Sequence, residues 1–256
     1  MLVGVPKEIK THEYRVGLIP ASVRELVHHG IDVMVEEGVG TEIGFYDEIY
    51  EAAGAKLAPD APTVFASADM IVKVKEPQSS EFSSIQDGQT IFTYLHLAAE
   101  PTLVDCLIEK GVTGIAYETV EDRIGSLPLL TPMSEIAGRL APQIAARLLQ
   151  TDFGGPGRLM GGVPGSESCR MVIVGGGNVG LSAALIGTAL GARVIVFDRN
   201  LERLRYIEHI SGNRIKTMMS TPTKLTEYLS RADVVIGSVL IPGASAPKVI
   251  TREMMD

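Results

Sequence analysis

The sequence contains little cysteine. Its two cysteines, Cys106 and Cys169, lie 63 residues apart, with no Cys-x-x-Cys pair and no neighbouring histidine at the spacing of metal ligands. This excludes a scaffold held together by disulfides and predicts no metal site. Low cysteine usage is typical of a reduced, cytoplasmic protein, which is the location we expect.

The sequence also contains fewer basic than acidic residues. The chain has 23 basic and 31 acidic residues among 256, a formal net charge of −8, which repels phosphate backbones and anionic lipid. We therefore expect neither nucleic acid nor a membrane among its partners. Hydrophobic residues make up 45% and charged residues 21%, close to globular averages. This excludes global disorder and allows one large domain or two smaller ones.

Long apolar runs are absent from the start of the chain and are broken by glycine elsewhere. Met1–Glu8 has no apolar core of the signal-peptide type and predicts a strand instead. Met171–Ala192 has no charge over 22 residues, enough to span a bilayer. It contains six glycines, however, and is followed by the strand-like run Val194–Phe197. This order predicts strand, glycine turn, helix and strand rather than a membrane helix.

Short apolar runs alternate with helix-period segments along most of the sequence, which is typical of parallel sheets with helices on both faces. We expect an α/β fold of two doubly wound parallel-sheet domains, a substrate domain of residues 1–130 and a nucleotide-binding domain of residues 131–256. Helices are predicted over Ala21–His29 and between Pro101 and Gly111, each bracketed by proline and glycine. The predicted strands are Leu2–Val5, Ile31–Val35, Met70–Val74, Thr90–Leu95, Thr113–Tyr117 and residues 171–174, 193–197, 215–218 and 233–236.

A longer helix is predicted to begin at Thr131-Pro132, a cap followed by a first helical proline. One face of it is apolar, because four large residues are spaced by four, namely Ile136, Leu140, Ile144 and Leu148. Pro142 is expected to kink or break this helix. Thr151–Ser168, with six glycines and two prolines, is predicted to be a surface loop.

A glycine pattern predicts a nucleotide site in the second domain. Gly175, Gly177 and Gly180 form G-x-G-x-x-G directly after a strand and before a helix, and the next strand ends in Asp198. Such glycines permit a tight turn, approach of the backbone to a pyrophosphate, and close packing of helix on sheet, while the acid accepts ribose hydroxyls. The spacing predicts a Rossmann domain. Asp198 favours NAD over NADP, although Arg199 or Arg203 could bind a 2′-phosphate.

Three side chains of the first domain follow predicted strands. Arg15 lies between the first strand and the first helix, and Lys75 and His96 each follow an apolar run. Because ligands bind at the carboxyl ends of parallel strands, the three are expected to converge. A guanidinium binds a carboxylate with two hydrogen bonds, an ammonium polarises a carbonyl, and an imidazole moves a proton. Each alone is more often a solvated residue, but together they predict a site for a 2-oxo or 2-amino acid. His28 and His29, at a helix end, are assigned to the surface.

Several segments along the whole chain closely resemble one family. They are Val3–Glu8, Arg15-Val16 with Pro20-Ala21, Lys73–Pro77, Thr93–Ala98, Ala116–Thr119, Pro132–Glu135, Leu159–Gly165 and Val239–Ala244. They resemble the alanine dehydrogenases of bacteria. The resemblance implies NAD-dependent oxidative deamination of L-alanine to pyruvate and ammonia, and the reverse reductive amination, by a homo-oligomer that is typically a hexamer.

The resemblance also implies roles for residues of this chain. Arg15 and Lys75 would bind the substrate, with Lys75 and His96 as catalytic residues and His96 as the acid/base. For NAD it implicates residues beyond the three glycines, namely Ser134, Asn178, Val179, Asp198, Arg203, Ser220, Val239 and Leu240.

One related class gives the alternative function. The NAD(H)-binding part of proton-translocating transhydrogenase is similar around Arg15 and the glycine loop, but it lacks the counterpart of His96 and performs no amino-acid chemistry. His96 therefore favours the dehydrogenase. Family members continue through further strands with an essential aspartate, whereas the second domain here has four predicted strands of an expected six. We accordingly expect a split or truncated gene product, or part of a longer chain.

Overall fold

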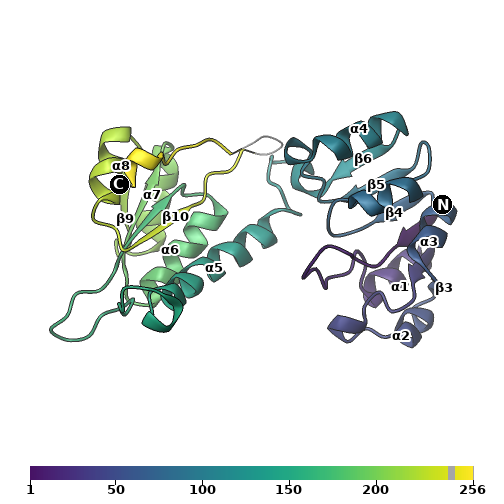
Figure 1. Ribbon diagram of the computed structural model, residues 1–256, viewed down its shortest axis with the longest axis horizontal. Coiled ribbons are helices and arrows are strands. Elements are labelled where there is room, and N and C mark those ends of the chain that lie inside the picture. The colour runs from purple at the N-terminus through teal and green to yellow at the C-terminus, as the bar shows by residue number, and fades with distance from the viewer. Residues whose placement is uncertain (242–245, 256) are drawn as a thin grey trace. The chain divides into compact units, whose positions relative to one another are not determined.

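The computed structural model describes residues 1–241 and 246–255, and it divides into two compact units, Met1–Leu127 and Pro128–Asp256 (Figure 1). The boundary expected from the sequence lies between residues 130 and 131. Residues 242–244 of the Val239–Ala244 segment lie outside the described residues.

The first unit is built on a parallel sheet of six strands within the described residues, in the order β3-β2-β1-β4-β5-β6. The strands are β1 (Leu2–Val5), β2 (Asp32–Glu36), β3 (Lys56–Ala58), β4 (Met70–Val72), β5 (Thr90–Thr93) and β6 (Thr113–Ala116). The helices are α1 (Pro20–His28), α2 (Asp47–Ala52), α3 (Ala61–Ser67) and α4 (Pro101–Glu109). Short 3₁₀ turns follow several strands, at η1 (Thr41–Ile43), η2 (Ser79–Ser84), η3 (Leu97–Ala99) and η4 (Tyr117–Thr119).

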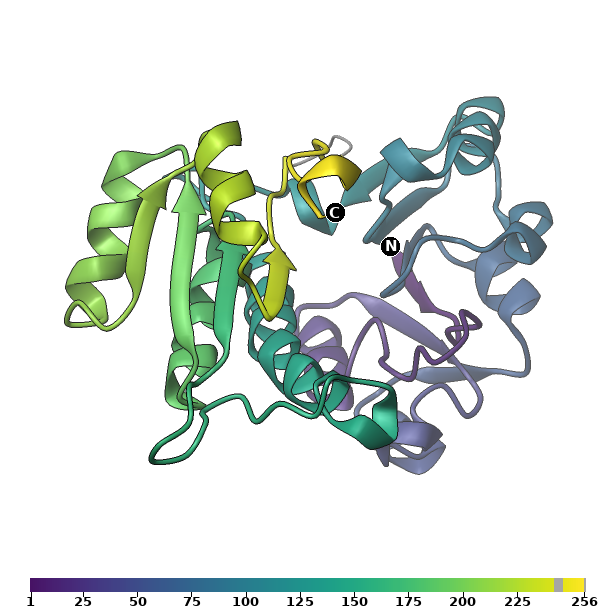
Figure 2. The same ribbon diagram turned by 60° about the vertical axis from the view of Figure 1, so that its left-hand side comes forward.

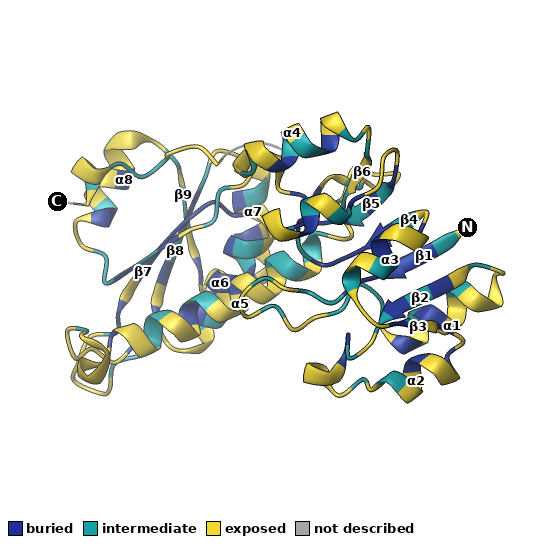
Figure 3. Cartoon of the chain, turned by 45° about the vertical axis from the view of Figure 1, so that its right-hand side comes forward, coloured by how far each residue is buried: buried dark blue, intermediate teal, exposed yellow. Residues whose placement is uncertain are grey.

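Both faces of this sheet are covered, as in a doubly wound fold. On one face Val3, Val5 and Val35 pack with Val23 of α1 and Tyr50 of α2. A second core on the other face includes Ile71 and Ile91 from the sheet, Phe65 of α3 and Leu103 of α4. The central strands are therefore buried on both sides, seen as dark blue segments in Figure 3. Strands that are apolar on both faces are typical of parallel sheets.

The second unit contains, in its described part, a parallel sheet of four strands in the order β10-β7-β8-β9. In Figure 2 the green strands and the yellow β10 lie side by side. The strands are β7 (Arg170–Val174), β8 (Arg193–Asp198), β9 (Lys216–Met219) and β10 (Val234–Gly237). The helices are α5 (Thr131–Leu148), α6 (Asn178–Ala189), α7 (Leu201–Ile210) and α8 (Pro222–Leu229), with 3₁₀ turns η5 (Thr151–Phe153) and η6 (Arg252–Met254).

This sheet also has two packed faces. Alternation along β7 sends Met171 and Ile173 into a core with α6 and α7, and Val172 and Val174 into a core with α8. The strand, turn, helix and strand predicted for Met171–Ala192 and its continuation are therefore confirmed. No helix within the described residues is long and apolar enough to cross a membrane. The two parallel-sheet units confirm the predicted fold class.

The helix α5 runs unbroken through Pro142, so of the kink or break expected at this residue, the break does not occur. Pro142 and Gly138 are its buried residues, and α5 packs so tightly on α6 that a Cβ on Gly138 would lie 2.3 Å from the carbonyl oxygen of Val179. This packing holds the helix although proline supplies no N–H. The predicted apolar row of α5 is exposed, at Ile136, Leu140, Ile144 and Leu148.

Candidate functional site

The glycine loop between β7 and α6 has the geometry that its spacing predicts. Gly175 has a φ of 105°, and a Cβ there would lie 2.9 Å from the backbone of Ser238 after β10. At Gly180 a Cβ would lie 1.8 Å from the carbonyl oxygen of Gly175. Only glycine fits either place, because a side chain would collide with backbone atoms. Gly177 differs, since a Cβ on it meets no atom of the described residues within 4 Å.

Asp198, at the end of β8, is bound to this loop. Its Oδ2 atom accepts a hydrogen bond of 2.6 Å from the N–H of Gly176, and its Oδ1 atom accepts one of 2.8 Å from Asn200. Asn200 in turn caps α7 through the N–H of Arg203. The Nε atom of Arg203 donates to the carbonyl oxygen of Gly176. Its buried Nη2 atom has no hydrogen-bond partner among the described residues.

The other residues implicated in NAD binding lie around the same loop or at the start of α6. Asn178 donates from Nδ2 to Thr131 Oγ1 over 3.2 Å, so the first turn of α5, which includes Ser134, lies beside the first turn of α6. The N–H of Ser220 donates to the carbonyl oxygen of Asp198 at 2.9 Å. Val179 lies in the first turn of α6, and Val239 and Leu240 directly follow Ser238, whose hydroxyl donates to Gly175.

These residues fit a dinucleotide. The start of α6 has no side-chain cap, so its first N–H groups are available to a phosphate. The open space at Gly177 allows a ligand to approach the backbone closely. Asp198 offers carboxylate oxygens and Arg203 a donor beside them. The loop can therefore hold a pyrophosphate with a ribose near Asp198.

In the first unit, Arg15 lies on the segment between β1 and α1. It is held by Glu13, whose carboxylate accepts from Arg15 Nε at 2.8 Å and from Nη2 at 2.5 Å. The hydrogen bond from Arg15 lowers the pKa of Glu13, and the same bond raises the pKa of Arg15. The guanidinium is therefore fixed in direction while its side chain stays 48% exposed, which lets it meet a carboxylate from solution.

Lys75 lies three residues beyond the end of β4, which is shorter than predicted. Its Nζ atom is 3.4 Å from Glu76 Oε2, and its side chain is 21% exposed. Burial acts to raise the pKa of Glu76, but hydrogen bonding from Lys10 and the charge of Lys75 lower it overall. Lys75 is thus a largely enclosed cation beside an ionised carboxylate.

His96 follows β5 and has a left-handed backbone conformation, with φ 49°. Glu118, in η4 after the neighbouring β6, accepts from the N–H of His96 at 2.7 Å and from that of Leu95 at 3.3 Å. The Nδ1 atom of His96 is 3.8 Å from Glu118 Oε1, and the side chain is 46% exposed. The carboxylate of Glu118 therefore fixes the backbone at His96 and lies beside the Nδ1 edge of its ring.

The structure brings these three predicted side chains to one edge of the sheet, at the carboxyl ends of β1, β4 and β5. Tyr94 links them: its ring is stacked on that of His96, with centroids 6.0 Å apart, and its hydroxyl is within electrostatic range of Arg15. The positive charge of Lys75 likewise contributes to the lowered pKa of Glu13. Sequence reasoning missed Glu13, Tyr94 and Glu118. The available signal was their position, since Glu13 and Tyr94 each lie two residues before a predicted site residue and Glu118 follows the strand β6.

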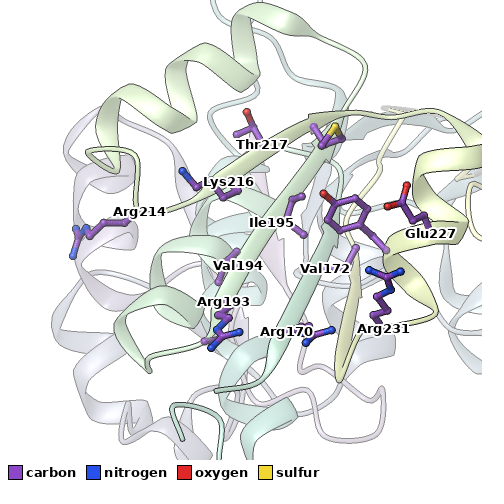
Figure 4. A pocket seen from close by; sticks show the side chains of 13 residues that line it. Arg170, Val172, Arg193, Val194, Ile195, Arg214, Lys216, Thr217, Glu227 and Arg231 are labelled. Carbon is purple, nitrogen blue, oxygen red and sulfur yellow. The ribbon is translucent and has the colours of Figure 1, made fainter. Parts of the chain in front are cut away.

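Two of the cavities formed by the described residues each lie within a single unit. One, of about 170 Å³, is beside Arg15 and is lined by Glu8 and Glu13 among others. The other, of about 710 Å³, is on the sheet of the second unit, between β7, β8, β9 and α8 (Figure 4). Its floor includes Val172 and Ile195, and its rim is basic. None of the predicted site residues lines this larger cavity, so volume alone does not mark the candidate site.

Comparison with known proteins identifies the family of the chain. Residues 4–137 match the alanine dehydrogenase/PNT N-terminal domain, and residues 141–256 match the C-terminal domain of the same family. The chain belongs to the alanine dehydrogenase/PNT family. It is 51% identical to alanine dehydrogenase of Methanococcus maripaludis over 255 residues, which cover 100% of this chain and 68% of that protein.

Solved structures agree with this placement. An L-alanine dehydrogenase superposes with a TM-score of 0.88 at 48% identity, covering 99% of this chain and 70% of that one. The transhydrogenase from Sinorhizobium meliloti superposes with a TM-score of 0.81 at 27% identity, covering 100% and 74%. Both branches of the family therefore share the fold, and the sequence is closer to the dehydrogenase than to this transhydrogenase.

Proposed function

We propose that this protein is an NAD-dependent alanine dehydrogenase, which converts L-alanine to pyruvate and ammonia and catalyses the reverse reductive amination. The observation that supports this most directly is the grouping of Arg15, Lys75 and His96 at one sheet edge. The 51% identity to a protein named alanine dehydrogenase supports the choice of substrate. In this assignment the first unit binds the substrate and the second binds NAD.

Arg15 binds the carboxylate of alanine or pyruvate, with its guanidinium held in place by Glu13. Lys75 contributes a second positive charge, which polarises the carbonyl oxygen of pyruvate. His96 moves the proton: because Nδ1 faces Glu118, Nε2 is the ring nitrogen that exchanges protons with the substrate. In the direction of deamination it accepts a proton from the water that adds to the imino carbon and then returns that proton to the amino nitrogen, so that the C–N bond breaks, ammonia leaves and the hydroxyl loses its proton to become the carbonyl of pyruvate.

NAD, when bound, supplies the acceptor for the hydride that leaves the Cα of alanine. We assign its pyrophosphate to the glycine loop and the start of α6, and its adenosine ribose to Asp198. Ser134, Asn178, Val179, Arg203, Ser220, Val239 and Leu240 complete the proposed cofactor set. A carboxylate at the tip of β8 repels a 2′-phosphate, which supports NAD over NADP.

Two further properties belong to the proposal. We place the protein in the cytoplasm, supported by its two free cysteines, Cys106 and Cys169. We also propose a homo-oligomer, a hexamer by family resemblance, supported by the exposed apolar row on α5. Light scattering of the purified protein tests the oligomer, since a monomer at micromolar concentration would contradict it.

The function is tested by following the absorbance of NADH when NAD and a panel of amino acids are incubated with the purified chain and with the product of the longest reading frame at its locus. We expect the product of the longest reading frame to form NADH with L-alanine and to consume NADH with pyruvate plus ammonia. A transhydrogenase-type module would bind NAD(H) and turn over no amino acid. That outcome would overturn the proposal in favour of the alternative.

A further inference from the structure

Three charged side chains are buried under the candidate substrate site. Lys73 is 0% exposed, and the side chains of Glu8 and Glu81 are 4% and 5% exposed. Lys73 Nζ lies 3.4 Å from Glu8 Oε2 and 2.8 Å from Glu81 Oε1. Buried ion pairs are costly, and apolar residues of the same size often stabilise a fold better. The cluster therefore calls for an explanation other than stability.

Glu8 differs from Glu81 in what its carboxylate holds. Glu8 Oε1 accepts from the backbone N–H of Val74 at 2.6 Å and from that of Lys75 at 3.3 Å. Glu81 instead accepts from the N–H of Gln78, within its own turn η2. Both glutamates thus contact Lys73, but only Glu8 contacts the segment that ends in Lys75.

The bonds to Glu8 replace a missing strand partner. Beside β4, β1 ends at Val5, so no strand of the first unit faces Val74 and Lys75 on that side. On the other side the segment is held by β5 and its continuation. The backbone N–H of Lys73 donates to the carbonyl oxygen of Phe92, and the carbonyl oxygen of Val74 accepts from the N–H of Tyr94. The carbonyl oxygen of Lys75 accepts from Thr93 Oγ1. With Glu8 in place, the backbone before the Lys75 side chain is fixed from both sides.

The same carboxylate lies next to Arg15. Glu8 and Arg15 line one cavity of about 170 Å³, and the charge of Glu8 contributes to the raised pKa of Arg15. The Arg15 segment is itself pressed onto the end of β4, since a Cβ on Gly17 would lie 2.4 Å from the carbonyl oxygen of Val72. Burial raises the pKa of Glu8, and Lys73 and the two N–H groups oppose that rise.

We propose that Glu8 is a positioning residue, which fixes the Lys73–Lys75 backbone so that the Lys75 ammonium faces the substrate beside Arg15. This inference rests on the proposed function, because that function assigns the substrate to Lys75. Lys73 balances the buried charge of Glu8. Glu8 contacts the backbone of Val74 and Lys75 and the buried ammonium of Lys73, and in this proposal it acts on the substrate only through Lys75.

The test compares Glu8→Ala, Glu8→Gln and the matched control Glu81→Gln. We expect Glu8→Ala to lower kcat/KM for L-alanine about 10²-fold, since a misplacement of about 1 Å costs that much. The loss should be mainly in KM, with the Kd of NAD unchanged. Glu8→Gln retains an oxygen acceptor for Val74 and should restore kcat/KM to within about tenfold of the wild type. Glu81→Gln should lower the unfolding midpoint and leave kcat/KM as it was.

Two readouts do not depend on turnover. Hydrogen exchange of the Val74 and Lys75 amides should accelerate in Glu8→Ala and not in Glu81→Gln. The second readout is the rate at which an amine-reactive reagent modifies Lys75, measured by mass spectrometry. Lys56, whose side chain is 69% exposed, is the internal reference. Pyruvate should slow the modification of Lys75 in the wild type and not in Glu8→Ala.

The outcomes separate the two proposals. No turnover and no pyruvate protection in the wild type would contradict the proposed function, and amide exchange would still decide the role of Glu8. Unchanged exchange at Val74 and Lys75 in Glu8→Ala would overturn the inference. Equal losses of kcat/KM in Glu8→Ala and Glu81→Gln would also overturn it, because they would indicate a structural role shared by the whole cluster.

Discussion

Asp198 Oδ2 accepts a hydrogen bond of 2.6 Å from the backbone N–H of Gly176. The residue expected to recognise a ribose is therefore also a support of the glycine loop. These two roles can be separated by substitution, because an amide side chain can still accept a hydrogen bond from Gly176 but has no negative charge.

Asp198→Asn should shift cofactor preference from NAD toward NADP by about tenfold or more, a change of about 1.4 kcal/mol in relative binding free energy. The carboxylate that repels a 2′-phosphate is removed, and Arg199 and Arg203 remain nearby. Titration of both dinucleotides against protein fluorescence measures the ratio. Asp198→Ala, which also removes the acceptor for Gly176, should weaken both. Equal affinity of the wild type for NAD and NADP would contradict the assignment.

His96→Asn should lower turnover of L-alanine by about 10²-fold or more, the usual effect of losing a general acid/base. Asparagine is the suitable replacement because His96 has a φ of 49°, a conformation that asparagine tolerates better than alanine. The Kd of NAD should change little. His28→Asn, at an exposed histidine on the end of α1, is the control and should be fully active. Parallel losses of activity and folding stability in His96→Asn would indicate a structural histidine.

Gly177→Ala should weaken NAD binding about tenfold or more, about 1.4 kcal/mol, while the free energy of unfolding stays within about 1 kcal/mol of the wild type. The new methyl group meets no atom within 4 Å in the part of the chain that the structure describes, and it occupies the space assigned to the pyrophosphate. Calorimetric titration and urea unfolding provide the two measurements.

Gly180→Ala is the matched comparison in the same loop. Its Cβ would lie 1.8 Å from the carbonyl oxygen of Gly175, so backbone must move and unfolding should become easier by about 1–3 kcal/mol or more. If Gly177→Ala bound NAD as tightly as the wild type, the pyrophosphate would have to lie elsewhere.

The buried hydroxyl of Tyr50 should make the folding stability of the protein decrease at alkaline pH. Tyr50 is 0% exposed, its hydroxyl donates to the carbonyl oxygen of Leu18 at 3.0 Å, and burial raises its pKa to about 12. Because the folded-state pKa lies above the unfolded value of about 10, its contribution to stability is complete below pH 10. That contribution is lost as the pH rises through about 12.

Tyr50→Phe should remove this part of the pH dependence. Urea unfolding midpoints of the two proteins, compared between about pH 8 and about pH 11, should fall more steeply for the wild type. Tyr94 and Tyr117 also have a raised pKa and stay in both proteins, so the difference isolates Tyr50. Identical pH dependence of the two midpoints would contradict the prediction.

The sequence by itself determined the alternation of strands and helices, the glycine loop and the position of an acidic residue at the end of β8. These features depend on short-range rules: a backbone that only glycine can adopt at Gly175, side-chain alternation along β7, and an acid at the end of the next strand. Arg15, Lys75 and His96 were found in the same way, because residues that follow parallel strands must meet at one sheet edge.

Other features were decided only by tertiary structure, because they depend on contacts between residues far apart in the chain. The three-residue strand β3 was missed because its pattern is too short to detect, and it is defined by pairing with β2. Whether Pro142 would break α5 depended on packing against α6, and this packing also left the large apolar residues exposed. Glu8 is separated by 66 residues from Val74, so no local periodicity could have linked this carboxylate to the Lys75 segment.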